Sequence, residues 1–307
     1  MTTQLSAKRH CGVSPCCRRG INNDCDNCAV TQIIAALSLK GGVGKTSVVL
    51  GLAGAAAERG LRVLVVDLDP QANSTASLDP HHTPFTSSDV LFDARPGIAS
   101  EAIVSSGWDS QIQLLPSERA LEHRATPDGP DSSQRLKRAL TGVTEAFDLV
   151  LIDCPPSLGE LTRNALYAAT DALVVTEPSF FAVNGAEQAL EAVSIVSTHG
   201  NPQLRPIGIV ANRVRPTLPE HNYRMDELRS AFGDLVLGGL PDRAAIQQAQ
   251  GACVPVQQWT SNGAADINNA LGRLLDGLRP TIETADLRQA SARPALVTTS
   301  TNEGPRS

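Results

Sequence analysis

Short runs of apolar residues alternate with longer helical segments along most of the chain. The apolar runs are continuous, which is typical of strands buried on both faces of a parallel sheet. Predicted strands cover residues 33–39, 62–66, 112–115, 149–152, 172–175, 207–211 and 235–240. Predicted helices cover residues 47–58, 132–146, 158–169, 186–196, 225–232, 243–249 and 265–278. This order predicts a single doubly wound α/β domain, with a mostly parallel sheet of seven or eight strands and helices on both faces.

Three stretches lack this pattern. Residues 1–31 are polar and rich in cysteine, and residues 80–108 are rich in Pro, Ser, Thr and Asp. Residues 280–307 are dominated by Pro, Thr and Ser. We expect a flexible extension, a long connection and a disordered tail, respectively. The folded domain is therefore expected over residues 32–279.

Composition narrows the class of protein. Of 307 residues, 41% are hydrophobic and 19% are charged, which excludes wholesale disorder. The net charge is −6, which excludes a uniformly basic nucleic-acid binder but not a local basic patch. No apolar run reaches the ~18 residues of a membrane span. The N-terminus has no apolar core of a secretory signal, and the tail has no amphipathic stripe. We therefore expect a cytoplasmic protein that does not bind membranes.

A glycine-rich loop joins the first predicted strand to the first helix. It reads Lys40-Gly41-Gly42-Val43-Gly44-Lys45-Thr46. Glycines let successive backbone N–H groups turn toward a phosphate, and the helix that follows points its N-terminus at the same spot. Lys45 would neutralise phosphate oxygens, and the Thr46 hydroxyl would ligate Mg²⁺. The loop fits the P-loop pattern, except that Leu39 stands where the leading glycine is expected.

Aspartates end two of the predicted strands. Asp67 and Asp69 follow the second strand, and Asp153 follows a fully apolar one, as in a Walker B motif. The carboxyl ends of parallel strands face the phosphate site in this architecture. We therefore expect these carboxylates beside the loop.

The first residue of the loop, Lys40, and several later blocks resemble the sequence of a known family. Lys40 resembles the signature lysine of the deviant Walker A ATPases, the ParA/MinD group. Two further blocks resemble the ParA branch, Asp-Leu-Asp-Pro-Gln from Asp67 and Asp-Cys-Pro-Pro-Ser from Asp153. Glu-Pro-Ser-Phe-Phe from Glu177 resembles the family segment after the next strand. The resemblance runs from about residue 33 to residue 278, some four-fifths of the chain.

The resemblance implies a role for each matching side chain. Lys40 would reach across a nucleotide-sandwich dimer to the partner's phosphates, and Asp69 would position or activate the attacking water. Asn212 would read adenine, although an Asn at a strand end is equally consistent with a turn. The implied metal ligands are Thr46, Asp67 and Asp153, and the implied cofactors are ATP and Mg²⁺. The implied nucleotide-binding set is Gly41, Gly42, Val43, Gly44, Lys45, Thr46, Ser47 and Asn212.

The family role implied is partitioning of a chromosome or plasmid. ATP would close a homodimer that binds DNA without sequence preference and associates with the nucleoid, and a ParB-like partner would stimulate hydrolysis. Relatives often place arginines where this chain has Asp242 and Ala245. Arg213, Arg215 and Arg243 are therefore the candidate DNA contacts. The alternative from the same family is a ParA-like protein that positions a protein cargo.

Five of the seven cysteines precede the first predicted strand. They are Cys11, Cys16, Cys17, Cys25 and Cys28. Such spacing suits Zn²⁺ or an iron–sulfur cluster, and it resembles the N-terminal cysteines of iron–sulfur scaffold ATPases. Ile34 occupies the position of the expected fourth cysteine, and the family's later Cys-Pro-x-Cys is absent. A chance cluster, a zinc site and a scaffold function therefore all stay open.

Overall fold

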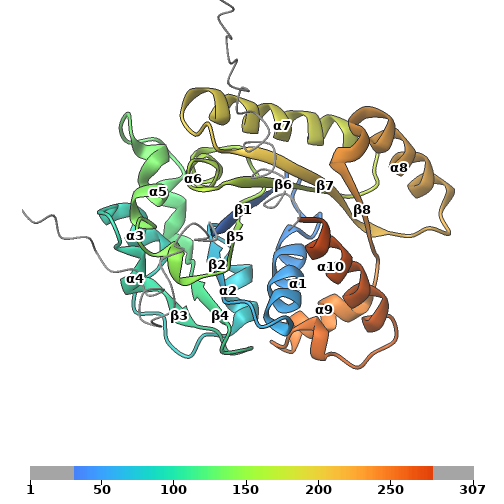
Figure 1. Cartoon of the computed structure of the whole chain (residues 1–307), viewed down its shortest axis with the longest axis horizontal. Helices are drawn as coiled ribbons and strands as arrows, with labels where there is room; N and C mark the ends of the chain where they lie inside the picture. The colour runs from blue at the N-terminus through green and yellow to red at the C-terminus, as the bar shows by residue number, and fades with distance from the viewer. Residues whose placement is uncertain (1–30, 279–307) are drawn as a thin grey trace, which may run out of the picture. The chain divides into compact units, whose positions relative to one another are not determined.

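The computed structural model describes residues 31–278, which build one eight-stranded sheet with helices on both faces (Figure 1). The strands run in the order β3-β4-β2-β5-β1-β6-β7-β8, and every neighbouring pair is parallel except β3 and β4. Their bounds are β1 Gln32–Leu37, β2 Val63–Asp67, β3 Val104–Ser105, β4 Ile112–Leu115, β5 Leu149–Asp153, β6 Asp171–Thr176, β7 Arg205–Val214 and β8 Val236–Pro241. The predicted fold class is confirmed, and the sheet has eight strands.

The helices differ widely in length. The α-helices are α1 Lys45–Glu58, α2 Asn73–Leu78, α3 Ser87–Asp93, α4 Ala99–Ala102, α5 Arg135–Ala139, α6 Glu160–Ala168, α7 Ala182–His199, α8 Pro219–Phe232, α9 Ala244–Gly251 and α10 Ala264–Leu278. Short 3₁₀ turns lie at η2 Arg119–Arg124, η3 Ser132–Gln134, η4 Thr144–Ala146, η5 Gly233–Leu235 and η6 Val256–Gln258.

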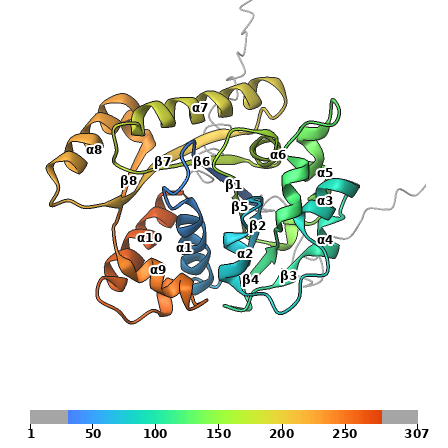
Figure 2. The same cartoon turned by 180° about the vertical axis from the view of Figure 1, so that it is seen from behind.

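Alternate residues of each central strand supply two hydrophobic cores. Ile34 and Ala36 of β1 join the core under α1, α9 and α10, whereas Ala35 and Leu37 join the core under α3 to α7. The period of two along a strand explains this division, because successive side chains point to opposite faces. Figure 2 shows α7 on one side of the sheet and α1 with α10 on the other. Aliphatic side chains therefore cover both faces of the sheet, since only 3% of the residues are aromatic.

The carboxyl end of β1 lies where the chain reverses its direction of winding. β1 pairs with β5 on one side and with β6 on the other. The chain first builds the sheet outward through β2, β4 and β3, and then through β6, β7 and β8. In doubly wound sheets the crevice outside such a switch point is the usual ligand site. The loop after β1 therefore opens into that crevice.

Two local expectations were wrong. Residues 80–108 are not a structureless connection, because they contain α3, α4 and β3. A capping box between Thr86 and Asp89 starts α3, and Val90 and Leu91 anchor it in the core. The helix expected over 132–146 is α5 with a 3₁₀ turn on each side. Gly142, with φ 74°, follows α5 and interrupts it.

The two ends of the described region meet at the amino ends of the parallel strands β1 and β6, on the side of the sheet opposite the crevice. The Gln32 Nε2 donates to the carbonyl of Leu278 at 3.1 Å and to Asp171 Oδ2 at 3.2 Å. The extension expected over residues 1–31 lies, apart from Thr31, outside the described residues, and so does the tail expected over 280–307. Among residues 31–278, no helix is both long and apolar enough to cross a membrane.

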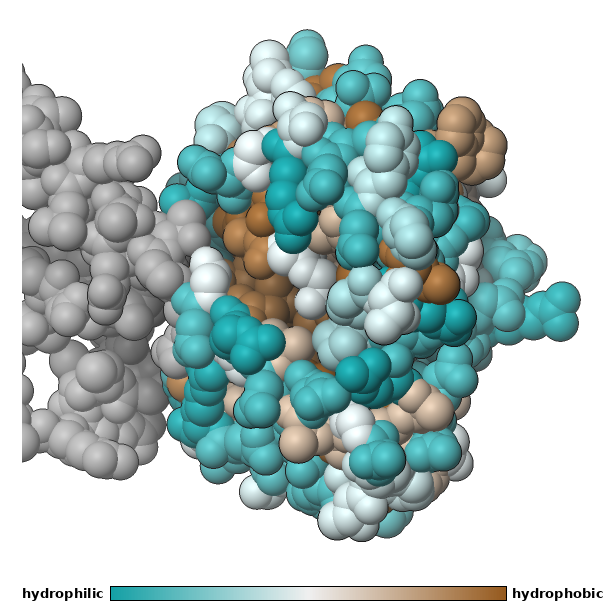
Figure 3. Space-filling view, turned by 90° about the vertical axis from the view of Figure 1, so that its right-hand side faces the viewer, coloured by the Kyte–Doolittle hydropathy of each residue, from teal (hydrophilic) through white to brown (hydrophobic). Residues whose placement is uncertain are grey.

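The strand at the far edge of the sheet is β8. Within the described part of the chain it pairs only with β7, and Val236 and Leu237 are partly buried against the cores. Figure 3 faces this side and shows a hollow with hydrophobic atoms inside a mostly hydrophilic surface. Gly238 and Gly239 lie within the strand and Pro241 ends it, and these residue types weaken pairing with another chain.

Candidate active site

The glycine loop after β1 folds as its composition predicts. Gly44 caps the amino end of α1 with φ 82°, and Gly42 has φ 83°, a region that favours glycine. A Cβ on Gly44 would lie only 2.2 Å from Nδ2 of Asn212, so no other residue fits there. The amino end of α1, with its unpaired N–H groups and positive dipole end, therefore faces the crevice. This is the geometry of a phosphate-binding loop.

A buried cluster surrounds the first residues of α1. Lys45 Nζ lies 2.5 Å from Asp153 Oδ1, and the two side chains are only 6% and 0% exposed. The other oxygen of Asp153 accepts hydrogen bonds from Thr46 Oγ1 at 2.7 Å and from Ser74 Oγ at 2.8 Å. Burial acts to lower the pKa of Lys45, but the charge and hydrogen bond of Asp153 outweigh it and raise that pKa. Lys45 is therefore held as a cation at the loop.

The end of β2 supplies a second buried carboxylate. Asp67 accepts hydrogen bonds from the backbone N–H of Asp69 at 3.0 Å and from the N–H and hydroxyl of Thr75 at 2.9 and 2.8 Å. Burial, together with the charge of Asp153, raises the pKa of Asp67 to about 7. Asp67 thus anchors α2, the helix that carries Ser74, to the end of β2. A cation bound beside Asp67 and Asp153 would offset the repulsion between them and favour the ionised form of Asp67.

Asp69 lies at the mouth of this cluster. Its Oδ1 accepts the N–H of Gln71 at 2.9 Å, and its carbonyl accepts the Ser117 hydroxyl at 2.7 Å. Burial raises the pKa of Asp69, but the side chain still lines the cavity that opens above the loop. A carboxylate at that position is placed to accept a proton from a water molecule in the cavity.

The cavity has a volume of about 450 Å³. It is lined by Ser38, Lys40, Gly42, Val43, Gly44, Lys45, Thr46, Ser47, Asp69, Gln71, Asn73, Ala76, Ser77, Pro156, Arg213 and Gln250. The lining comes from the loop, from α2, from the segments that follow β2 and β5, and from β7 and α9. Its size and its basic floor suit a nucleotide.

Lys40 stands at the lip of the cavity and differs from Lys45 in its surroundings. Its ammonium pairs with Glu177, which follows β6, and its side chain is 55% exposed. The cationic end of Lys40 is therefore paired at the surface and not among the buried carboxylates. Gly41 beside it lies close to Pro156, which a Cβ on Gly41 would contact at 3.7 Å.

The end of β7 brings two further side chains onto the loop. Asn212 is buried, and its Nδ2 donates to the carbonyl of Val43 at 2.9 Å. Arg213 Nη1 donates to the carbonyl of Gly42 at 2.7 Å. The amide nitrogen of Asn212 is thus engaged with the loop, and its role in reading adenine stays a prediction. Arg213, named as a DNA candidate, lies at the cavity.

The other two DNA candidates are paired with carboxylates. Arg215 contacts Asp242 at 2.5 Å and is 60% exposed, and Arg243 contacts Asp266 at 2.8 Å and is 37% exposed. Both are surface pairs, which are worth about 0–1 kcal/mol and exchange readily for another anion. Their assignment to DNA stays a prediction. The five N-terminal cysteines lie outside the described residues.

Magnesium fits this donor set. No group of three or more His, Cys, Asp or Glu side chains within residues 31–278 could hold a metal ion alone. Mg²⁺, however, usually takes one or two protein oxygens and completes its shell with phosphates and water. Thr46 Oγ1 and the carboxylate of Asp153 lie together at the floor of the cavity, with Asp67 behind them. These residues would hold the ion against the phosphates.

Sequence reasoning missed five polar residues of the site. They are Ser74, Thr75, Ser117, Glu177 and Gln250. The first two belong to the segment that follows Asp-Pro-Gln, so their position in that block was the available signal. Glu177 opens the block after β6 that resembles the family segment, so that block was the signal for it. Nothing local marks Ser117 or Gln250, because each comes from another strand end or helix. Gln250 of α9 accepts the Ser47 hydroxyl at 3.1 Å.

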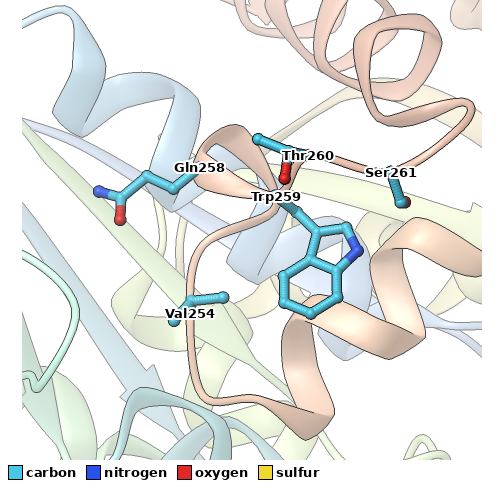
Figure 4. Close-up of a pocket in the computed structure, with 5 residues that line it drawn as sticks. All are labelled: Val254, Gln258, Trp259, Thr260 and Ser261. Atoms are coloured by element: carbon cyan, nitrogen blue, oxygen red, sulfur yellow. The ribbon is translucent and has the colours of Figure 1, made fainter.

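A second cavity, of about 320 Å³, lies beside η6 and the segment that follows it (Figure 4). It is lined by Val254, Gln258, Trp259, Thr260 and Ser261. The side chain of Gln258 points away from the indole of Trp259, whose Nε1 donates to Gln248 at 3.2 Å. None of the lining side chains is charged, so this cavity is a poor site for an anionic nucleotide.

A phosphate loop with an extra lysine, a buried Walker B aspartate and a doubly wound sheet together define a P-loop NTPase of the deviant Walker A class. A family model described as an AAA domain matches residues 31–206. Sporulation initiation inhibitor protein Soj of Bacillus subtilis is 33% identical over 209 residues, covering 67% of this chain and 81% of that protein. Chromosome-partitioning ATPase Soj of Thermus thermophilus is 35% identical over 213 residues, covering 68% and 80%. The chain belongs to the ParA/Soj family of the MinD superfamily.

The solved structures agree with this fold. Cobyrinic acid a,c-diamide synthase from Mycobacterium smegmatis, solved with ADP and magnesium, is 28% identical and has a TM-score of 0.64. The match covers 86% of this chain and 97% of that structure. A nucleotide and magnesium are thus bound by a protein of the same fold.

Proposed function

We propose that this protein is a ParA-type ATPase that hydrolyses ATP to ADP and phosphate and uses the reaction as a dimerisation switch. In this role it partitions a chromosome or plasmid in the cytoplasm, at the nucleoid when ATP is bound. The observation that carries the proposal is the split between two lysines of one loop. Lys45 is buried against Asp153, whereas Lys40 is exposed at the lip in an exchangeable pair with Glu177.

The residues of the cavity divide the work of hydrolysis. Lys45 and the backbone N–H groups of the loop bind the phosphates. Mg²⁺, held through Thr46 and Asp153, would neutralise charge that develops on the phosphates. Asp69 would orient the attacking water and accept its proton. Most of the catalysis is then positioning and electrostatics, as expected for phosphoryl transfer.

A second copy of the chain is the proposed partner at the lip. Three aromatic side chains are exposed near the end of β6 and on α8. Phe180 and Phe181, which follow Glu177 in the chain, and Tyr223 of α8 are 70%, 66% and 57% exposed. Arg224 stacks on the rings of Phe180 and Tyr223 at 5.1 and 5.0 Å. Exposed aromatic side chains grouped in this way are typical of interaction surfaces. A nucleotide held between two such lips would receive Lys40 from the opposite copy.

DNA is the proposed ligand of the ATP-bound dimer. The net charge of −6 means that affinity for DNA must come from a local patch and not from bulk charge. Arg215 and Arg243 supply candidate cations, each held by a single carboxylate that a phosphate could replace. Dimerisation doubles the number of such arginines facing one duplex. A ParB-like protein is the proposed stimulator of hydrolysis.

DNA binding across a salt series tests the proposal. We expect weak binding without nucleotide and strong, sequence-independent binding with ATP and Mg²⁺. If about four phosphates are neutralised, log K falls with log salt at a slope of about −4. Arg215→Glu combined with Arg243→Glu should flatten the slope while ATP binding persists. ATP-loaded dimer without affinity for DNA at low salt would contradict the DNA role and favour a protein cargo.

A further inference from the structure

Asp153 is shared between the phosphate loop and α2, the short helix that follows β2. Its Oδ1 pairs with Lys45, and its Oδ2 accepts hydrogen bonds from Thr46 Oγ1 at 2.7 Å and from Ser74 Oγ at 2.8 Å. A carboxylate oxygen has two lone pairs, so these two hydroxyl groups use both positions on Oδ2. A Mg²⁺ ion, or a water molecule of its shell, needs one of these positions to bind Asp153. Binding of the ion at this oxygen therefore requires one hydroxyl to leave.

The two hydroxyl groups belong to helices that are anchored very differently. Thr46 lies in the first turn of α1, which buries most of its residues in the core. In α2 only Ser74 and Leu78 are buried. Thr46 can also keep its hydrogen bond to Asp153 while it ligates the ion, because a hydroxyl has one proton and two lone pairs. Ser74 is therefore the donor that yields.

The backbone on both sides of α2 is strained. Ala72, before the helix, has φ 52°, and Asp79, after it, has φ 44°. A left-handed conformation costs energy in a residue with a Cβ, and such residues cluster at segments that change conformation. Elements with few buried side chains are also those that open most easily. The backbone of α2 is thus suited to a shift when the bond from Ser74 to Asp153 breaks.

The carboxyl end of α2 is held by the segment before β4. The indole Nε1 of Trp108 donates to the carbonyl of Ser77 at 2.5 Å, and the N–H of Gly107 donates to the carbonyl of Leu78 at 2.7 Å. Trp108 is partly buried against the core under α1. A shift of α2 changes the surroundings of this indole, so the chain contains its own fluorescent reporter of the helix.

We infer that Ser74 is a positioning residue that competes with Mg²⁺ for Oδ2 of Asp153, and that its displacement shifts α2. This inference rests on the proposed ATPase function, which brings the ion to Asp153 with a nucleotide. Asn73, Ala76 and Ser77 of α2 line the cavity, so a shift of the helix changes the surface that faces the nucleotide. The Ser74 hydrogen bond thereby limits how much Mg²⁺ strengthens nucleotide binding.

Calorimetric titration of the full chain with ADP, once with excess Mg²⁺ and once with EDTA, tests the competition. Ser74→Ala removes the competing donor without adding volume. We expect its affinity for ADP to be unchanged in EDTA and to rise about tenfold in Mg²⁺, the size of one hydrogen bond to a charged group. An equal affinity of wild type and variant in Mg²⁺ would overturn the competition. Weaker binding of the variant in Mg²⁺ would also overturn it, because Ser74 would then help to hold the ion.

The matched control is Ser133→Ala. Ser133 Oγ donates to Oε1 of Glu160 at 2.9 Å, so this variant also removes a hydroxyl group from a buried carboxylate, but outside the cavity. Its affinity for ADP should match that of wild type under both conditions. A rise in Mg²⁺ like that of Ser74→Ala would show a general effect of such substitutions and would overturn the specific role of Ser74.

Fluorescence tests the shift of α2. The chain has two tryptophans, Trp108 and Trp259, so Trp259→Phe leaves Trp108 as the single tryptophan emitter. We expect its emission maximum to move when Mg²⁺ is added to ADP-bound Trp259→Phe protein, and no such change in Trp108→Phe, which keeps Trp259. Constant emission of Trp108, with the gain in ADP affinity still present, would overturn the shift of α2. An equal change in Trp108→Phe would overturn it as well.

Failure of the proposed function gives a different result. Folded wild-type protein that binds ADP neither in Mg²⁺ nor in EDTA would contradict the nucleotide site itself. Wild-type protein that binds ADP more tightly in Mg²⁺, beside a Ser74→Ala variant with the same gain, would contradict only the role of Ser74.

Discussion

Each end of the phosphate loop has a lysine that pairs with a carboxylate, but one pair is buried and the other is exposed. At its carboxyl end, Lys45 and Asp153 form an ion pair that is 6% and 0% exposed, with two hydroxyl groups on the second carboxylate oxygen. At its amino end, Lys40 and Glu177 form an ion pair that is 55% and 24% exposed. Five positions separate the lysines in sequence, but one pair lies in the floor of the cavity and the other at its lip.

Burial gives the two pairs different consequences. A buried pair loses hydration that neither partner can recover alone, so removing one partner leaves an uncompensated charge. An exposed pair exchanges its partner for water or another ion at little cost. The buried ion pair of Lys45 and Asp153 is therefore expected to persist, whereas Lys40 can leave Glu177 and bind another anion. This difference is what a site assembled from two copies of the chain requires.

The largest expected effect is that of Lys45→Ala. It should abolish ATP binding, because it removes the cation that faces the phosphates. It should also lower the free energy of unfolding by about 3–5 kcal/mol, since Asp153 is left buried without a counter-charge. Calorimetric titration and urea denaturation measure the two effects.

A double variant separates the loss of ATP binding from the loss of stability. Lys45→Met with Asp153→Asn removes both charges, so it should recover most of the lost stability while ATP binding stays absent. Near-normal affinity for ATP in Lys45→Ala would remove the assignment of the phosphate loop.

Asp69→Ala is expected to affect turnover alone. Hydrolysis should fall by about 100-fold or more, because the group that orients and deprotonates water is lost. ATP binding and the ATP-dependent dimer should persist, because Lys45 and Lys40 are unchanged. A coupled phosphate-release assay and light scattering with ATP check both parts. A monomeric Asp69→Ala protein would show that Asp69 shapes the interface as well.

Lys40→Ala should change assembly with little effect on stability. Its ion pair with Glu177 is exposed, so the free energy of unfolding should change by less than about 1 kcal/mol. The variant should bind ATP and stay monomeric, because the cation that reaches the other copy is gone. Sedimentation with ATP and urea denaturation test this. Glu177→Gln is the matched control, because it frees Lys40 and should leave the dimer intact. A loss of stability as large as that of Lys45→Ala would remove the contrast between the two lysines.

The smallest expected effect is that of removing residues 1–30. Both ends of the loop are formed by residues after the start of β1 at Gln32, so ATP affinity and hydrolysis should stay within about twofold of wild type. Metal analysis of full-length protein purified without oxygen accompanies the assay. An iron–sulfur cluster that is lost in Cys25→Ser would favour the scaffold function over partitioning.

The sequence alone determined the parts of the fold and site that depend on local pattern. Continuous apolar runs predicted seven of the eight strands, because a strand buried on both faces has no polar side to interrupt it. The sequence predicted site roles for six residues because each is part of a short block with a recognisable spacing: Lys40, Lys45, Thr46, Asp67, Asp69 and Asp153. The strand missed was β3, two residues that pair with β4 at the sheet edge, too short for a periodic signal.

The tertiary structure decided which of these groups are buried and which distant residues join them. No local pattern shows that Ser74 donates to Asp153, that Gln250 accepts from Ser47, or that Lys40 is paired and Lys45 enclosed. These contacts depend on strand order, which places the ends of β2, β5, β6 and β7 around one loop. The conformation of Arg213 also involves the tertiary structure, because its left-handed φ coincides with a register shift between β7 and β8. Burial and pairing arise from residues far apart in the chain, so only the folded molecule establishes them.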